Sequence, residues 1–466
     1  MNFISTRGGD TLSFGEAVIQ GLAGDGGLFV PERLPPLAQH LPGWRGLPYA
    51  ALAQEFLSLF ATDIPSGELA GCVQRAYATF PTPTSPAPLI PLDTDKVPLY
   101  VMELFHGPTL AFKDFALQLL GQFYGRHIRI SGQPVHILGA TSGDTGSAAI
   151  YGVLGQPDVH SFILYPEGRI APLQERQITT TGSPLVHPLA IHGSFDDAQA
   201  IVKEIFGDTD FVHTHALTAV NSINIARILA QCIYYLDAAL KLGASETEPL
   251  EFVVPTGNFG NVLAGWMLSR MGVPGLRFCV VTNANDVVAR FFQTGEYHPG
   301  KVSTSLAPSM DIQQASNFER WLWWHLEGDS IRVAALMAKL RSEGSFSLGS
   351  PEKLCGGILR TASCDDAGIE RSIQHVHEET GYLADPHTAC AFASVRQDVR
   401  SVVVATAHPA KFPEAIMKTT GLRPTHPILE HLKNLPVKKQ ILPANSQAVR
   451  QAITGVLASI KEQRRG

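Results

Sequence analysis

The sequence predicts an α/β fold with mostly parallel strands, and three observations support that prediction. From about residue 97 onward, short runs rich in Val, Ile and Phe alternate with segments of helical periodicity. These runs are apolar throughout, which is typical of parallel strands that helices cover on both faces. A chain of 466 residues, 45% apolar and 17% charged, is also large enough for two or three domains with sizeable cores.

Residues 1–90 precede this alternation and predict mostly helices and loops. Residues 13–23 and 48–61 carry amphipathic helical patterns, and the proline-rich stretch 81–93 is typical of a linker. The strands that we expect beyond it are 97–104, 134–140, 159–166, 185–191, 251–255, 277–283 and 401–407. The helices that we expect there begin at Pro108, near residue 145, after the N-cap Ser194 and after Asn261, and the last one covers 445–462.

Composition and charge exclude several classes of partner. The formal net charge is −6 without a long basic run, so we expect no binding to nucleic acid or to a membrane surface. No stretch of about 18 apolar residues predicts a membrane span, and the first residues lack a signal-peptide pattern. The six cysteines form no closely spaced pair, which indicates a reduced, cytoplasmic setting. Residues 375–382 crowd two His and two Glu, which we interpret as an exposed helix face and not as a metal site.

One lysine stands inside an apolar run, HGPTLAFKDFALQLLG, at residues 106–121. A helix that starts at Pro108 places Lys113 on the apolar side and puts Asp114, Gln118 and Gln122 on the polar face. The ordinary interpretation is a lysine that snorkels at the edge of a core. The alternative is a desolvated, nucleophilic amine of the kind that forms Schiff bases with carbonyl substrates or with pyridoxal phosphate. That alternative requires a phosphate-binding loop and a partner for a pyridine ring elsewhere in the chain.

Two strand–loop–helix segments are candidates for binding these groups. Residues 251–268 pass from a strand through Thr256–Asn261 into a helix, where two glycines and free N–H groups suit an anion. A plain strand-to-helix turn explains this pattern equally well. Residues 138–150 lack the Lys-Ser/Thr of a P-loop, and Asp144 would repel a phosphate while it can accept a hydrogen bond from a hydroxyl. The neighbouring hydroxyls belong to Thr141, Ser142 and Thr145.

Two further stretches offer groups for a ring nitrogen and for a second anion. Thr406 ends a buried strand, where its hydroxyl can meet a ring nitrogen or cap its own turn. Asn221 and Ser222 stand at the start of a predicted helix, where they can bind an anion, and Arg227 adds a fork of donors.

Taken together, these stretches resemble the threonine synthase family of pyridoxal-phosphate enzymes with the tryptophan-synthase-β fold. The resemblance implies fold type II, with two α/β domains of mostly parallel sheets and the helical N-terminal region of the longer bacterial and fungal branch. On this basis we expect an N-terminal domain over 1–92, a smaller α/β domain over 93–215 and a larger one over 216–466. The matching stretches run through the chain in the family's order: 5–32, 103–121, 139–150, 220–231, 254–266, 309–323, 385–391 and 406–412.

The resemblance also implies roles for single residues. Lys113 would form the Schiff base with pyridoxal phosphate, Asp144 would lie beside the cofactor's 3′-oxygen, and Thr406 would meet the pyridine nitrogen. The cofactor phosphate would bind to Gly257, Asn258, Phe259, Gly260 and Asn261. The substrate phosphate would bind to Thr141, Ser142, Asn221, Ser222 and Arg227.

The implied reaction is the last step of threonine biosynthesis. A carbon–oxygen lyase, expected to be a cytoplasmic monomer, converts O-phospho-L-homoserine and water into L-threonine and phosphate by γ-elimination and β-addition of water. Two alternatives stay open: a phospho-lyase of the same fold that releases 2-oxobutyrate, and a non-catalytic binder of phosphorylated metabolites. Measuring threonine against 2-oxobutyrate distinguishes the phospho-lyase from a threonine-forming enzyme. The presence of Lys113 together with its surrounding elements argues against the non-catalytic binder.

Overall fold

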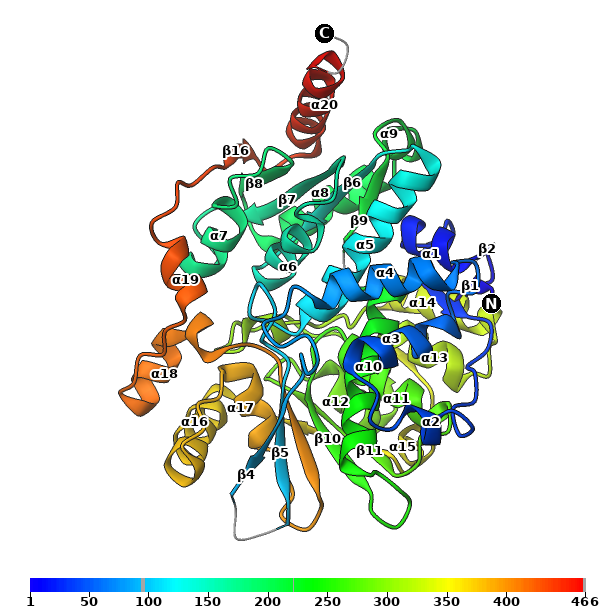
Figure 1. Cartoon of the computed structure of the whole chain (residues 1–466), viewed down its shortest axis with the longest axis vertical. Helices are drawn as coiled ribbons and strands as arrows, with labels where there is room; N and C mark the ends of the chain where they lie inside the picture. The colour runs from blue at the N-terminus through cyan, green and yellow to red at the C-terminus, as the bar shows by residue number, and fades with distance from the viewer. Residues whose placement is uncertain (94–96, 221, 464–466) are drawn as a thin grey trace.

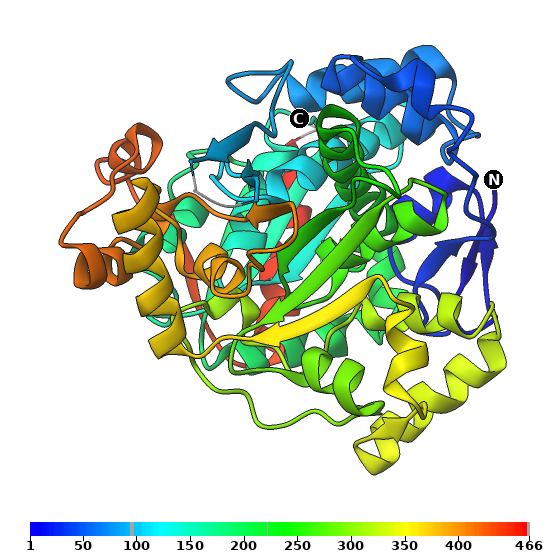
Figure 2. The same cartoon turned by 90° about the horizontal axis from the view of Figure 1, so that it is seen from below.

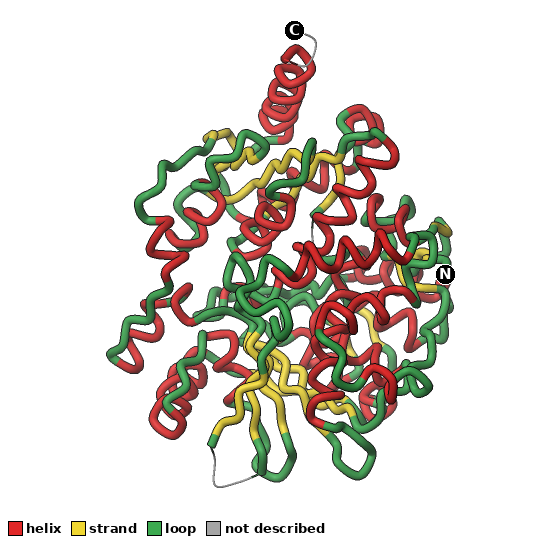
Figure 3. The backbone as a smooth tube through the Cα atoms, viewed as in Figure 1, coloured by secondary structure: helices red, strands yellow, loops and turns green. Residues whose placement is uncertain are grey.

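The computed structural model of the chain describes residues 1–93, 97–220 and 222–463. It contains a six-stranded and a five-stranded sheet, each covered by helices (Figure 1). In Figure 3 the strands of these two sheets form two separate groups, with helices and loops between them. Within the described residues, every strand pair of these two sheets is parallel except β4–β5 at one edge. The predicted α/β fold with mostly parallel strands is confirmed.

The six-stranded sheet has the order β14-β11-β10-β15-β5-β4. Along β10, Phe252 and Val254 belong to the core shared with α10 and α11, whereas Val253 belongs to the core shared with α16 and α17. Both faces of the sheet are therefore buried, which explains the continuous apolar runs. Its strands are β4 (Leu89–Leu92), β5 (Leu99–Glu103), β10 (Leu250–Pro255), β11 (Leu276–Thr282), β14 (Leu359–Ser363) and β15 (Ser401–Ala405). The helices of this part are α10 (Ile225–Leu242), α11 (Gly260–Arg270), α12 (Val287–Thr294), α13 (Phe318–His325), α14 (Ser330–Glu343), α15 (Pro351–Cys355), α16 (Asp366–Thr380), α17 (Pro386–Phe392) and α18 (Pro413–Thr420), together with a short ribbon of β12 (Glu296–Tyr297) and β13 (Phe346–Ser347).

The five-stranded sheet has the order β16-β8-β7-β6-β9. Leu138 and Phe162 face the core under α8 and α20, whereas Ile137 and Ile163 face the large core that contains α5 and α6. The strands are β6 (Val135–Ala140), β7 (Val159–Pro166), β8 (Val186–His192), β9 (Leu217–Ala219) and β16 (Gln440–Pro443). The helices are α5 (Lys113–Ser131), α6 (Asp144–Val153), α7 (Pro172–Thr179), α8 (Phe195–Phe206), α9 (Thr209–Thr214), α19 (Pro427–Leu432) and α20 (Ser446–Gln463).

Each of the two sheets takes strands from distant parts of the chain. β5 pairs with β15 in the six-stranded sheet, while β9 and β16 join β6, β7 and β8 in the five-stranded sheet. The segments 93–215 and 216–466 therefore both contribute strands to both sheets. The division of the chain into domains at these boundaries stays a prediction.

The N-terminal region contains a small sheet that the sequence did not predict. β1 (Phe3–Ser5) pairs antiparallel with both β2 (Thr11–Leu12) and β3 (Phe29–Pro31). The predicted helical content is present in α1 (Phe14–Gln20), α2 (Leu41–Trp44), α3 (Tyr49–Ser58) and α4 (Ser66–Tyr77). Figure 2 shows this region, in blue, on the side of the molecule opposite α16 and α18. The stretch 81–93 is not a linker throughout, because it ends in β4, which extends the six-stranded sheet.

Two details predicted for the helix around Lys113 are wrong. α5 begins at Lys113 and not at Pro108, because the preceding segment pairs with the chain after β15: Phe112 N–H donates to Thr406 O, and His408 N–H donates to Leu110 O. Leu110 has a φ of 61°, in the left-handed region, which a helix starting at Pro108 cannot contain.

The predicted polar face of α5 is also absent from the structure. Asp114, Gln118 and Gln122 are all buried, because α5 packs against α4, α6 and α10. Gln122 Oε1 accepts a hydrogen bond from Arg75 Nε of α4 at 2.7 Å. The neighbouring helix α4 therefore supplies the hydrogen bond that water would supply on an exposed face.

The structure also bears on the membrane span and the metal site that the sequence analysis excluded, and on the state of the cysteines. Within the described ranges, no helix combines the length and apolar character that a bilayer crossing needs. In the same part of the chain, no three His, Cys, Asp or Glu side chains are arranged to hold a metal ion. All six cysteines are free thiols, and His375 and Glu379 lie on an exposed face of α16.

Candidate active site

Lys113 is the first residue of α5 and is 9% exposed, which fits the desolvated amine and not a lysine that snorkels into water. Its Nζ lies 3.5 Å from Asp144 Oδ2 and over the ring of Phe112. Burial lowers the pKa of the Lys113 ammonium, the negative charge of Asp144 opposes this, and the charges of Lys411 and Arg227 add to the lowering. The net shift makes the neutral, nucleophilic amine more accessible.

Asp144 opens α6 and is the centre of the polar network around Lys113. Its Oδ1 is 2.6 Å from Lys411 Nζ and accepts from Gln174 Nε2 at 2.9 Å, while its Oδ2 accepts from Ser309 Oγ at 3.4 Å. Burial alone raises the pKa of Asp144, but Lys411 and Lys113 outweigh it and hold that pKa well below its usual range. Asp144 is therefore a carboxylate and a hydrogen-bond acceptor at neutral pH.

Residues 256–261, called the glycine loop below, connect β10 to α11. Phe259, the N-cap of α11, has a left-handed φ of 63°, a backbone conformation that non-glycine residues rarely adopt and that concentrates at functional sites. Among the described residues, the backbone N–H groups of Gly257, Asn258 and Phe259 have no acceptor. Free N–H groups followed by a helix N-terminus form a ready site for an anion.

The glycines of this loop leave little room for a side chain. A Cβ on Gly257 would lie 3.0 Å from Ser309 O and from Ile312 Cδ1, and a Cβ on Gly260 would lie 3.0 Å from Asn317 Nδ2. Asn261 Oδ1 accepts from Tyr234 and Tyr235, while its buried Nδ2 has no partner among the described residues. The loop thus has a fixed shape and a surplus of donors.

Arg227 lies in the first turn of α10 and is 3% exposed. Its Nε and Nη1 are buried and have no hydrogen-bond partner among the described residues. Burial lowers the pKa of the Arg227 guanidinium to about 10, so it is still a cation at neutral pH. A buried cation with unpaired donors is costly, and an anionic ligand at this place would remove that cost.

The other predicted residues line the same region. Ser142 is exposed, Ser222 is partly exposed, and Thr406 follows β15 directly and is buried. Thr141 Oγ1 accepts hydrogen bonds from the N–H groups of Gly143 and Gly146, so it also shapes its own loop. Asn221 lies outside the described residues, and its predicted role stays a prediction.

Bridging residues bring the predicted pieces together. Ser309 Oγ donates to Asp144, and the carbonyl oxygen of Ser309 lies beside Gly257 of the glycine loop. Asn317 N–H donates to Asn258 O at 3.1 Å, and Asn317 Nδ2 donates to Ser222 O at 3.0 Å. Phe112 N–H donates to Thr406 O, which ties the start of α5 to the end of β15. Lys113, Asp144, the glycine loop, Ser222 and Thr406 therefore belong to one connected site.

Several residues of this site were missed at the sequence level. Lys411 and His387 lie in stretches that resemble the family, but nothing in their spacing shows that they meet Asp144 and Ser309. His387 Nδ1 is 2.7 Å from Asp385 Oδ1, and its Nε2 accepts the Ser309 N–H at 3.1 Å. Gln174 gave no signal at all, because it is an ordinary helical glutamine in sequence.

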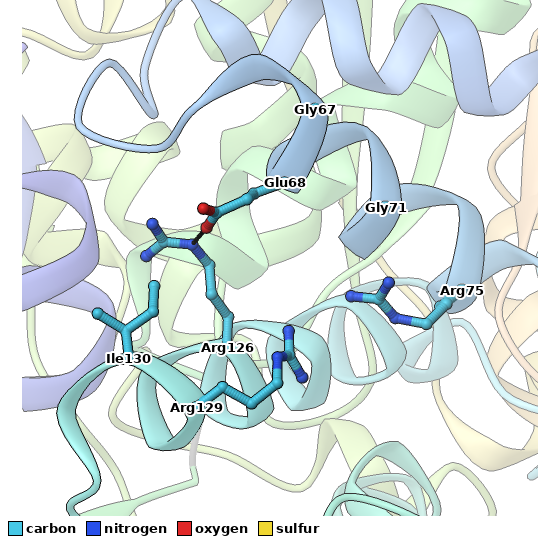
Figure 4. Close-up of a pocket in the computed structure, with 7 residues that line it drawn as sticks. All are labelled: Gly67, Glu68, Gly71, Arg75, Arg126, Arg129 and Ile130. Atoms are coloured by element: carbon cyan, nitrogen blue, oxygen red, sulfur yellow. Dashed lines mark hydrogen bonds and ion pairs between the residues drawn. The ribbon is translucent and has the colours of Figure 1, made fainter.

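A separate surface hollow of about 210 Å³ lies between α4 and α5 (Figure 4). Arg75, Arg126 and Arg129 extend into it, and Arg126 forms an ion pair with Glu68 at 2.6 Å. Arg126 is about 20 Å from Lys113 along α5 at 1.5 Å per residue. This hollow is therefore not part of the site around Lys113.

Comparison with known proteins first defines the class. A family profile described as "Pyridoxal-phosphate dependent enzyme" matches residues 77–337, which include Lys113, Asp144 and the glycine loop. The fold is accordingly fold type II of the pyridoxal-phosphate-dependent enzymes. Profiles described as "Threonine synthase N terminus" and "Threonine synthase, C-terminal" match residues 2–77 and 387–453.

Individual relatives agree over nearly the whole chain. Threonine synthase of Pseudomonas aeruginosa is 41% identical over 93% of each chain, and that of Schizosaccharomyces pombe is 39% identical over 89% of this chain and 88% of its own. The crystal structure of PLP-bound threonine synthase from Brucella melitensis matches 98% of this chain and 99% of its own, with a TM-score of 0.91 and 39% identity. The chain belongs to the threonine synthase family.

The residues present fit a pyridoxal-phosphate cofactor. The site holds a buried lysine with a lowered pKa, a carboxylate beside it and a loop whose first N–H groups have no acceptor in the part of the chain that the structure describes. These groups match an aldehyde, a ring hydroxyl and a phosphate, which are the three polar ends of that cofactor.

Proposed function

We propose that this protein converts O-phospho-L-homoserine and water into L-threonine and phosphate, with pyridoxal phosphate as its cofactor. The observation that carries the proposal is the presence of two different anion-binding places beside one buried lysine. The glycine loop offers uncharged N–H donors, and Arg227 offers a buried cation with unpaired donors. A cofactor phosphate and a substrate phosphate account for both.

Residues from four places in the chain would hold the cofactor. Lys113 would bind it covalently, the glycine loop residues Gly257–Asn261 would bind its phosphate, and Thr406 would meet the ring nitrogen. Asp144 would accept a hydrogen bond from the 3′-hydroxyl. When bound, pyridoxal phosphate supplies an electron sink for the negative charge that develops at the substrate's α carbon.

Lys113 also moves protons during the reaction. Once the substrate amine has replaced it, its neutral Nζ would take the proton from Cα and then one from Cβ, whose C–H electron pair expels the phosphate from Cγ. The same amine would later return protons at Cγ and at Cα. A lowered pKa suits this role, because a general base works best when its pKa lies near the operating pH.

Arg227 acts on the leaving group. Charge builds on the phosphate as the Cγ–O bond breaks, and a preorganised guanidinium in a buried place stabilises that charge more than water does. The hydroxyls of Thr141, Ser142 and Ser222, with the amide of Asn221, complete the proposed phosphate site. Water then adds at Cβ to give threonine.

The proposal is tested by incubating the cofactor-loaded enzyme with O-phospho-L-homoserine and measuring threonine, 2-oxobutyrate and inorganic phosphate in the same samples. We expect threonine and phosphate in equal amounts. Phosphate with 2-oxobutyrate in place of threonine would identify a phospho-lyase, and no release of phosphate would identify a non-catalytic binder. Lys113→Ala is the control, since it removes the covalent link to the cofactor.

We further propose that the enzyme is a monomer and works in the cytoplasm. The free thiols, most of them buried, support a reducing compartment. Light scattering coupled to size-exclusion chromatography measures the mass directly, and a value twice that of one chain would overturn the monomer.

A further inference from the structure

A second lysine, Lys411, is buried in the same site and has no part in the reaction described so far. It lies in the short 3-10 helix η2 (Pro409–Lys411) that follows β15, and its side chain is 0% exposed. Its Nζ is 2.6 Å from Asp144 Oδ1 and donates to Thr109 O at 2.8 Å. Asp144 therefore stands between two lysine ammonium groups, with Lys113 at 3.5 Å on its other oxygen.

The two lysines lie at different distances from the Asp144 carboxylate, and this difference indicates different roles. The shorter contact, reinforced by Gln174 on the same oxygen, makes Lys411 the principal counter-ion of Asp144. If Lys113 were the only counter-ion, the pair would hold Lys113 as an ammonium, because a nearby opposite charge favours the charged form. An ammonium neither attacks an aldehyde nor removes a proton.

We propose that Lys411 is a positioning residue that neutralises Asp144 and thereby leaves Lys113 free to lose its proton. Asp144 and Lys411 together act as one neutral hydrogen-bonding unit beside the cofactor. This inference rests on the proposed function only for the identity of the reaction, since the charge arrangement is independent of the substrate.

Other charged and titratable groups face this unit. Asp114 at the start of α5 and His387 on α17 each interact electrostatically with one member of the pair, and Arg227 on α10 acts on Lys113. His408, next to η2, also senses the charge of Lys411. None of these groups, as placed in the described residues, forms a direct ion pair with Asp144, so Lys411 is the one to remove.

The test follows the absorbance of the bound cofactor against pH in the holoenzyme, because the link between cofactor and Lys113 changes colour when its nitrogen gains a proton. Lys411→Met leaves the negative charge of Asp144 uncompensated, so we expect the pH midpoint to rise by about one to three units. Asp144→Asn removes the negative charge while Lys411 stays, so its midpoint is expected to fall.

The double variant Asp144→Asn/Lys411→Met removes both charges and is expected to return the midpoint close to that of the wild type. It also keeps the test decisive if Lys411→Met alone does not fold, because it buries no unpaired charge. Lys241→Met is the matched control, since Lys241 pairs with Asp237 at 2.8 Å near the far end of α10, and we expect it to leave the midpoint unchanged.

Single variants whose midpoints stay at the wild-type value, or shift in the same direction, would overturn the inference. A loss of thermal stability without a midpoint shift would assign Lys411 a purely structural role and would overturn it as well. The proposed function is judged separately by threonine formation in the wild type, so failure of one does not entail failure of the other.

Discussion

The two proposed anion-binding places of this site are built in different ways. The glycine loop uses backbone N–H groups at the start of α11 and contains no charged side chain, whereas the second place depends on the guanidinium of Arg227. Backbone donors are fixed in position and suit a group that stays bound through every turnover. A cation becomes more valuable as charge develops, so it suits a phosphate that leaves. The difference indicates which anion each place binds, and four experiments test it.

The largest effect is expected for Gly260→Asp. The new Cβ would lie 3.0 Å from Asn317 Nδ2, and the carboxylate would face the cofactor phosphate. Like charges a few ångströms apart in a partly dry site cost on the order of several kcal/mol, so cofactor affinity should fall by orders of magnitude. Titration with pyridoxal phosphate, followed by absorbance, measures this. Unchanged binding would place the cofactor phosphate elsewhere.

The next largest effect is expected for Arg227→Leu, which removes the cation and leaves the glycine loop intact. Loss of a charge-assisted contact costs about 1.5–3 kcal/mol, or roughly one to two decades. Because phosphate departs in the reaction, part of the loss should appear in kcat as well as in KM. Arg129→Leu, in the surface hollow of Figure 4, is the matched control. Weakened cofactor binding, together with normal kinetics at saturating pyridoxal phosphate, would mean that the two places are exchanged.

A smaller effect is expected when inorganic phosphate is added to the holoenzyme. The cofactor already fills the glycine loop, so phosphate is expected to bind beside Arg227. At ten times its Kd, it should raise the free energy of unfolding by about 1.4 kcal/mol. Chemical denaturation measures this gain, which should vanish in Arg227→Leu and persist in Arg129→Leu. The reverse pattern would assign phosphate to the surface hollow.

The smallest effect is expected for Ser142→Ala. Ser142 is exposed at the loop before α6, and its hydroxyl would give the substrate phosphate one neutral hydrogen bond. Losing such a bond costs about 0.5–1.5 kcal/mol, so KM should rise by about two- to ten-fold. The absorbance of the bound cofactor should not change. A change in that absorbance with an unaltered KM would indicate that Ser142 contacts the cofactor and not the substrate phosphate.

Local signals in the sequence predicted part of the fold well. The strand predicted over 159–166 is β7 to the residue, and the predicted N-cap Ser194 starts α8, where it forms a capping box with Asp197. Both depend on neighbours in sequence: a continuous apolar run in one case and a side chain that reaches its own helix in the other.

Features that depend on distant partners were not predictable in this way. α5 starts late because residues around Leu110 pair with residues beyond β15, and β4 forms because β5 offers an edge. For the same reason the polar face assigned to α5 does not exist: helices on several sides bury Gln118 and Gln122.

The site shows the same limit. Lys113 was identifiable because a lysine inside an apolar run is unusual in itself, and Arg227 because it follows Asn221 and Ser222 at the start of a predicted helix. Lys411 and His387 were not, since their importance lies in reaching Asp144 and Ser309 across the fold. Resemblance to the family located the stretches, and the structure shows how their side chains meet.

The left-handed backbone of Phe259 has a consequence for how the cofactor is taken up. Such a conformation costs about 1–3 kcal/mol, and it persists here because the ring is 1% exposed and packs against Phe292 and Phe318, with centroids 6.0 and 5.8 Å away. The aromatic contacts therefore lock the loop into its binding shape before any ligand arrives. Binding of the cofactor to this loop would then cost little conformational entropy. The affinity would also not be lowered by loop conformations that cannot bind the cofactor.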